Sequence, residues 1–252
     1  MLTRQQLQRF AQRHHIGLQA QERDYLQYLL VAQLYFRSQE LAFKGGTALR
    51  MIYGGSRYSE DLDFNGPNDL AALHKLWSAV AKELGAYGIL AEIRGAWQSD
   101  VGYSFDVSYH GPLYDGRDRS KGKVRVDINL RAELVETRRE LVTSDYDDVR
   151  PFVVTVLTPD HLFAEKVRAL LVRGKPRDLH DLWLMHHKGW QLDRKLVVQK
   201  LDLYGLTFTP QALSQAVRRV APIWERDMRP LLPQFVPFDE VSRTVEALLP
   251  TA

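Results

Sequence analysis

Hydrophobic residues recur at two different spacings along the first part of the chain. A spacing of three to four residues, typical of amphipathic helices, runs over residues 21–39 and again over residues 68–84, where Asn68 is the expected N-cap. Shorter apolar or alternating runs between turn residues predict strands. These strands are expected at residues 41–43, 62–64, 91–97, 102–109, 123–130 and 151–157.

The pattern becomes helical after residue 157. Thr158 and Pro159 supply an N-cap and a proline at the first helical position. The expected helices are residues 158–173, 178–187, 193–204, 209–220 and 239–249. We therefore predict an α+β fold. An α+β domain with N-terminal helices spans residues 1–157, and a helical domain at residues 158–252 completes a cleft with it.

Composition narrows the chemistry that the chain can support. The 252 residues contain no cysteine, which excludes disulfides, thiolate metal sites and a cysteine nucleophile. Any metal must be held by oxygen or nitrogen ligands, which favours hard cations. No run approaches the ~18 apolar residues of a membrane span, and the N-terminus lacks the apolar segment of a signal peptide. A cytoplasmic protein without a membrane partner is expected.

Net charge alone does not identify a partner, because 34 Lys and Arg residues exceed 31 Asp and Glu residues by only three. The basic residues are nevertheless clustered. One cluster contains Arg117, Arg119, Lys121, Lys123 and Arg125, and a second contains Arg168, Arg173, Lys175 and Arg177. Each cluster is consistent with a solvated face or with binding of nucleic acid or nucleotide phosphate.

The strongest chemical pattern is a glycine turn followed by two aspartates. Gly45 and Gly46 end a predicted strand, and residues 47–52 read as a short helix with Thr47 near its start. Two glycines allow close approach of the backbone to a triphosphate, and a helix N-terminus offers amide donors to phosphate oxygens. Asp61 and Asp63 follow on the next strand, where a spacing of two places both carboxylates on one face. Either feature alone is common in turns and strand edges, but together they predict a metal-dependent nucleotide site.

Other polar residues fit around this pattern. A third carboxylate on a neighbouring strand would complete a two-metal site, and Asp127 is the first candidate because it faces away from the apolar side of its strand. Asp106 is the alternative. Arg57 is expected to bind phosphate and Ser59 to shape the loop, although both also fit an ordinary polar loop.

Two segments of the chain carry a resemblance to a known family. The run KGGTALRMIYGGSRYSEDLDF resembles the signature of the AbiEii/AbiGii-type nucleotidyltransferases, toxins of bacterial toxin–antitoxin and phage-defence systems that include the MenT toxins. The later run EKVRALLVRGKPRDLHDLW is similar to the second signature of that family. The resemblance covers residues 41–183 and implies a polymerase-beta-like nucleotidyltransferase fold.

The resemblance implies a role for individual residues. Gly46 and Thr47 correspond to the phosphate turn, where many members have serine in place of threonine. Asp61 and Asp63 correspond to metal ligands, and Asp127 fits the third acid. In the second segment Lys166 corresponds to a ligand of the nucleotide triphosphate, and Asp181 or Asp178 to a further catalytic acid. Arg173 lies seven residues after Lys166, on the same helical face, and is expected to bind nucleotide as well.

The function implied is transfer of NMP, with CMP favoured, from an NTP to an RNA acceptor, namely the 3′ end of tRNA. Mg²⁺ or Mn²⁺ is the implied cofactor and a cognate antitoxin protein the implied partner. Two alternatives stay open. The acceptor could be a small molecule, such as an aminoglycoside hydroxyl, or a protein side chain; or the chain could bind nucleotide without transferring it.

Overall fold

The structure is a computed structural model that describes residues 1–131, 133 and 135–248. Its internal contacts divide the chain into two compact units, Met1–Val156 and Leu157–Ala252.

The first unit is built around a mixed seven-stranded sheet with the order β3-β4-β5-β2-β1-β7-β6. The strands are β1 (Ala42–Lys44), β2 (Asp61–Asn65), β3 (Ala91–Ser99), β4 (Gly102–Tyr109), β5 (Gly122–Asn129), β6 (Thr137–Val142) and β7 (Phe152–Leu157). Strand β2 pairs antiparallel with β1 and parallel with β5, while β1 pairs parallel with β7. The predicted α+β class with a mixed sheet is confirmed.

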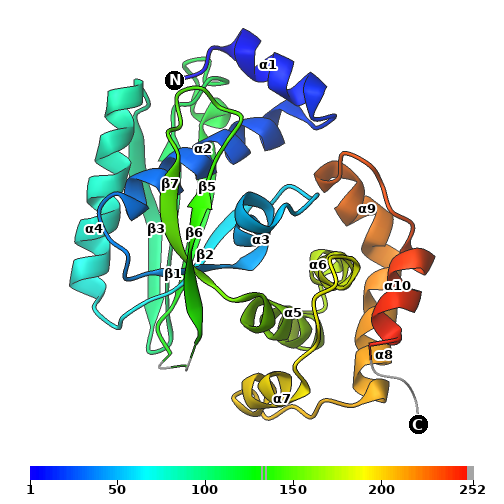
Figure 1. Cartoon of the computed structure of the whole chain (residues 1–252). Helices are drawn as coiled ribbons and strands as arrows, with labels where there is room; N and C mark the ends of the chain where they lie inside the picture. The colour runs from blue at the N-terminus through cyan, green and yellow to red at the C-terminus, as the bar shows by residue number, and fades with distance from the viewer. Residues whose placement is uncertain (132, 134, 249–252) are drawn as a thin grey trace. The chain divides into compact units, whose positions relative to one another are not determined.

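The helices of this unit pack against the sheet or against one another. They are α1 (Arg4–Arg13), α2 (Leu18–Tyr35), α3 (Gly45–Tyr53) and α4 (Leu70–Glu83), with short 3₁₀ turns at Leu84–Tyr87 and Asp118–Ser120. Helix α4 runs beside β3 (Figure 1) and buries Trp77 completely. The Trp77 ring packs edge-on against Phe64 of β2 at 5.6 Å and against Phe105 of β4 at 5.4 Å. These aromatic contacts fix one face of the central strands in the core and leave the other face to polar side chains.

Several predicted boundaries in this unit were wrong. The N-cap of α4 is Asp69, not Asn68, because the Asp69 carboxylate accepts a hydrogen bond from the amide of Ala72. Helix α2 begins before residue 21 and ends at Tyr35 rather than near residue 39. Helix α3 includes both glycines and begins at Gly45 rather than at Thr47.

The second unit is helical within the part of the chain that the structure describes. Its helices are α5 (Pro159–Arg173), α6 (Pro176–His187), α7 (Arg194–Asp202), α8 (Pro210–Val220), α9 (Trp224–Met228) and α10 (Phe238–Glu246), with short 3₁₀ turns at Ala221–Ile223 and Arg229–Leu231. Thr158 and Pro159 occupy the N-cap and first helical positions of α5, as predicted. Helix α6 begins at Pro176, two residues before the predicted start. The predicted end of the last helix, Leu249, lies outside the described residues.

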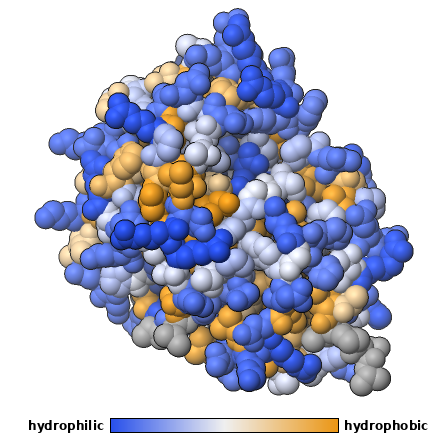
Figure 2. Space-filling view, viewed as in Figure 1, coloured by the Kyte–Doolittle hydropathy of each residue, from blue (hydrophilic) through white to orange (hydrophobic). Residues whose placement is uncertain are grey.

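The surface of the molecule is mixed in character. On the face shown in Figure 2, hydrophobic patches are interrupted by hydrophilic side chains. Among the described residues, no helix combines the length and the apolar character that a membrane span requires.

Candidate active site

The two predicted aspartates lie on the polar face of the central sheet. Asp61 and Asp63 alternate on β2 with Leu62 and Phe64, which are completely buried in the core. Strand β5 runs parallel to β2 in a register that pairs Asp63 with Asp127. Residues paired in this way lie about 4.8 Å apart across neighbouring strands. The three carboxylates therefore leave the same face of two adjacent strands, and the prediction that Asp127 points away from the core is confirmed.

The two glycines pack directly against side chains of the predicted site. Gly45 has a φ of +77°, in the left-handed region, and a Cβ atom there would overlap the Asp63 carboxylate. A Cβ atom on Gly46 would overlap the Arg57 guanidinium and would crowd the Ser59 hydroxyl. The turn thus requires glycine at both positions because the side chains of the site fill the adjoining space.

Thr47 connects the turn to the acidic strand. Its side chain is fully buried, and its hydroxyl donates a hydrogen bond to the backbone carbonyl of Asp61. Nearby, Arg57 is 2% exposed and its guanidinium donates to the Tyr58 carbonyl at 3.2 Å, while the Ser59 carbonyl accepts from Gln27 of α2 at 3.3 Å. The structure thus brings together the predicted site residues of the first unit, with Thr47 holding the start of α3 on β2.

Asp106, the alternative third acid, is placed differently from Asp127. It pairs in register with Arg125 on β4 and β5, one strand farther from Asp61 and Asp63. Its carboxylate lies 3.5 Å from both Arg125 Nη1 and Lys123 Nζ. Arg125 also approaches Asp127, with Nε 3.4 Å from Oδ1. Asp106 therefore sets the position of basic side chains, and Asp127 is the acid beside Asp63.

A hollow of about 330 Å³ opens beside these residues. It is lined by Arg23, Glu60, Asp61, Asp106, Lys123 and Arg125. Arg23 was not among the predicted site residues. It comes from α2 and pairs with Glu60 at 3.2 Å. Lys44 was not predicted as a site residue either, although the antiparallel register of β1 and β2 pairs it with Asp63. Its position directly before the two glycines is the signal that could have identified it.

The donors around Asp61 and Asp63 fit a hard divalent cation in their chemistry. Carboxylate oxygens are the ligands that Mg²⁺ and Mn²⁺ prefer, and Mg²⁺ ordinarily takes the rest of its coordination sphere from water and substrate phosphates. Within the described residues, no group of three or more His, Asp or Glu side chains is placed so that it could hold a metal ion, and Asp61, Asp63 and Asp127 are no exception. What the structure shows of these three aspartates is that they leave one face of two adjacent strands.

The predicted residues of the second unit form a buried charge cluster between α5 and α6. Lys166 Nζ lies 2.7 Å from Asp181 Oδ2 and 3.3 Å from Asp178 Oδ1, and both aspartates are fully buried. Arg173 binds Asp178 through two hydrogen bonds of 2.7 and 2.8 Å. Burial alone would raise the pKa of Asp178, but the charges of Lys166 and Arg173 outweigh it and hold that pKa below its ordinary value. Lys166 is therefore fixed in place, while the partly exposed Arg173 side chain keeps access to solvent.

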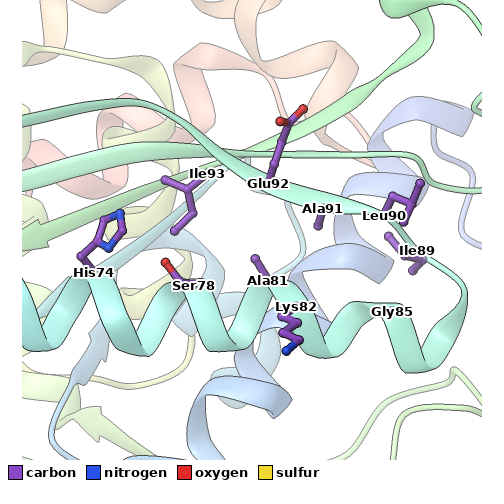
Figure 3. Close-up of a pocket in the computed structure, with 10 residues that line it drawn as sticks. All are labelled: His74, Ser78, Ala81, Lys82, Gly85, Ile89, Leu90, Ala91, Glu92 and Ile93. Atoms are coloured by element: carbon purple, nitrogen blue, oxygen red, sulfur yellow. The ribbon is translucent and has the colours of Figure 1, made fainter.

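A separate hollow of about 470 Å³ lies between α4 and β3 (Figure 3). Ala91 and Ile93 of β3 point toward α4, whereas Glu92 points away from it (Figure 3). None of the predicted site residues lines this hollow, so it is distinct from the aspartate site.

The glycine turn, the paired aspartates and the mixed sheet define a nucleotidyltransferase, and sequence comparison assigns the family. Residues 28–249 match the family described as nucleotidyl transferase AbiEii toxin, type IV toxin–antitoxin system. The chain belongs to this family and is a nucleotidyltransferase. No curated protein sequence matches the chain.

Solved structures share the fold. MenT4, a nucleotidyltransferase toxin of Mycobacterium tuberculosis, is 19% identical with a TM-score of 0.67, covering 98% of this chain and 88% of that protein. The JHP933 protein of Helicobacter pylori is 20% identical with a TM-score of 0.61, covering 92% of this chain and 91% of its own. A putative nucleotidyltransferase of H. pylori is 20% identical with a TM-score of 0.60, and the match covers 92% of this chain and 94% of that protein. At these identities the likeness concerns the fold.

Proposed function

We propose that this chain transfers NMP, preferentially CMP, from an NTP to the 3′-terminal hydroxyl of tRNA in a reaction that depends on Mg²⁺ or Mn²⁺. One observation carries the proposal: the parallel register of β2 and β5 pairs Asp63 with Asp127, beside a glycine turn that packs on the Asp63 carboxylate. Such an arrangement supplies adjacent oxygen donors for a cation and a helix N-terminus for phosphate. A cytoplasmic location follows from these substrates.

In the proposed reaction the acceptor hydroxyl attacks the α-phosphate of the nucleotide. A new phosphoester bond forms, the bond to the β-phosphate breaks, and pyrophosphate leaves. Asp61, Asp63 and Asp127 would hold the metal, which when bound lowers the pKa of the attacking hydroxyl and neutralises charge on the pyrophosphate. The amides at the start of α3 would bind phosphate oxygens of the nucleotide.

The buried cluster of the second unit would contribute cations to nucleotide binding. We propose Arg173 as a direct phosphate ligand, because it is the more exposed cation of the cluster and its partner Asp178 orients it through two hydrogen bonds. Lys166 is proposed as a second ligand of the triphosphate. Whether Asp178 or Asp181 serves as a further acid is tested by comparing activity in Asp178→Asn and Asp181→Asn.

The direct test is incubation of the purified protein with Mg²⁺ or Mn²⁺, each α-labelled NTP and total tRNA, followed by a denaturing gel. The wild type should label tRNA most strongly from CTP. Both Asp63→Ala and Asp127→Ala should abolish labelling, whereas Asp106→Ala should keep most of it. Absence of label on tRNA with every NTP would overturn the acceptor assignment and point to a small molecule or a protein side chain.

A further inference from the structure

A third hollow in the first unit, larger than the two described above, has no place in the function described so far. Its volume is about 580 Å³, and its walls come from α1, α2 and the segment around β5. Five basic side chains line it: Arg4, Arg23, Arg119, Lys121 and Lys123. The acidic lining residue is Glu22. A concave surface with this excess of cations is suited to an anionic ligand.

The charges in this hollow are only partly compensated by the protein. Lys121 pairs with Asp118 at 2.9 Å. Arg4 and Arg119 are exposed, and among the described residues neither lies within ion-pair distance of a carboxylate. The Glu22 carboxylate is buried and accepts a hydrogen bond from the amide of Leu113 at 2.6 Å. Burial raises the pKa of the Glu22 carboxyl, while the Leu113 amide and the Arg23 charge act in the opposite direction.

The basic hollow shares two lining residues with the hollow beside the candidate active site. Arg23 and Lys123 line both this hollow and the smaller one that contains Asp61. A row of cations therefore leads from the carboxylates, past Arg23 and Lys123, to Arg4 and Arg119. Its aromatic lining residue, Tyr109, is buried and offers no exposed ring for a base to stack on. The surface is suited to contacts with phosphates rather than with bases.

We propose that this basic hollow binds the sugar–phosphate backbone of the acceptor RNA strand just upstream of its reacting 3′ end. This inference rests on the proposed function. The nucleotide's phosphates are assigned to the start of α3, so a second cationic track beginning at the same aspartates fits the phosphodiesters that precede the reacting hydroxyl. Recognition through phosphates predicts that the sequence of these upstream nucleotides has little effect on binding.

The test compares two double variants of the full chain that remove the same charge. Arg4→Ala/Arg119→Ala removes exposed cations of the hollow, whereas Arg9→Ala/Lys75→Ala removes exposed cations of α1 and α4 that do not line it. Binding of a fluorescent single-stranded RNA is measured without nucleotide over a range of salt concentrations. The first variant should bind at least about tenfold more weakly at low salt. The slope of log K against log salt should become shallower by about 1.4, because each lost phosphate contact contributes about 0.7 for a single strand. The control variant should match the wild type.

Transfer activity separates this inference from the proposed function. A dinucleotide acceptor is too short to occupy the hollow, so the wild type and Arg4→Ala/Arg119→Ala should label it equally, while only the variant should label a longer RNA poorly. If the wild type labels RNA and Arg4→Ala/Arg119→Ala matches the control variant in affinity and salt slope, the inference fails and the proposed function stands. If the wild type neither binds nor labels RNA, both fail.

Discussion

Single residues at the glycine turn are constrained by the side chains around them. Replacing Gly45 by alanine costs about 1–2 kcal/mol for the left-handed backbone alone, and it also displaces the Asp63 carboxylate from its position. Gly45→Ala should therefore abolish transfer. The matched control is Gly88→Ala, where φ is +71° but no atom lies within 4 Å of the added Cβ. This variant should lose a similar conformational free energy and keep its activity. Comparable activity in both variants would contradict the proposed contact with Asp63.

Thr47 offers a second test at the same scale. Thr47→Ser keeps the hydroxyl that binds the Asp61 carbonyl and should keep most of the transfer activity. Thr47→Val keeps the shape but loses this buried hydrogen bond, so it should lower the free energy of unfolding by about 0.5–1.5 kcal/mol and reduce transfer more strongly. Thermal unfolding and labelling of both variants measure the difference. Wild-type stability and activity in Thr47→Val would show that the hydroxyl is dispensable.

Helices α5 and α6 are joined by the charge cluster of Lys166, Asp178 and Asp181. Replacing Lys166 by methionine leaves two buried carboxylates without this cation and should destabilise the protein by about 3–5 kcal/mol. Adding Asp181→Asn in the same chain removes one of the two charges and should restore part of the loss. Denaturant unfolding of the single and double variants measures this coupling. Equal stability of Lys166→Met and Lys166→Met/Asp181→Asn would contradict the coupling between these side chains.

The same cluster makes the stability of the second unit depend on pH. The folded-state pKa of Asp178 lies below its unfolded value of about 3.9, so its carboxylate stabilises the fold above that value. The contribution is lost as pH falls through the folded-state pKa. As pH falls below about 4, the protection of α5 and α6 from hydrogen exchange should therefore decrease less steeply in Asp178→Asn than in the wild type. Asp202→Asn, which removes an exposed carboxylate of α7 outside the cluster, is the control for the substitution itself.

The elements differ in how clearly the sequence predicts them. Strand β5 is recognisable because Val124, Val126 and Ile128 alternate with polar residues and are buried. Strand β6 was missed because its middle carries charged residues and the strand is largely exposed, so no alternation marks it. At the site, residue spacing predicts that Asp61 and Asp63 share a face. The register that pairs Asp63 with Asp127, and the packing of Arg57 on Gly46, depend on tertiary contacts that a local pattern does not contain.

On the scale of the whole molecule, each unit has a hydrophobic core of its own. Phe105 of β4 is fully buried in the first unit and Phe163 of α5 is fully buried in the second. Replacing either by alanine should cost about 3–5 kcal/mol, because the lost contacts leave a cavity that the neighbours fill only partly. The two variants remove the same side chain from different units and are therefore matched.

Separate cores predict that each substitution acts locally. By hydrogen exchange, Phe163→Ala should lose protection in α5 and α6 but keep it in β2 and β5, whereas Phe105→Ala should show the reverse. If instead both variants lost protection equally throughout, the division at Val156 would not separate folding units.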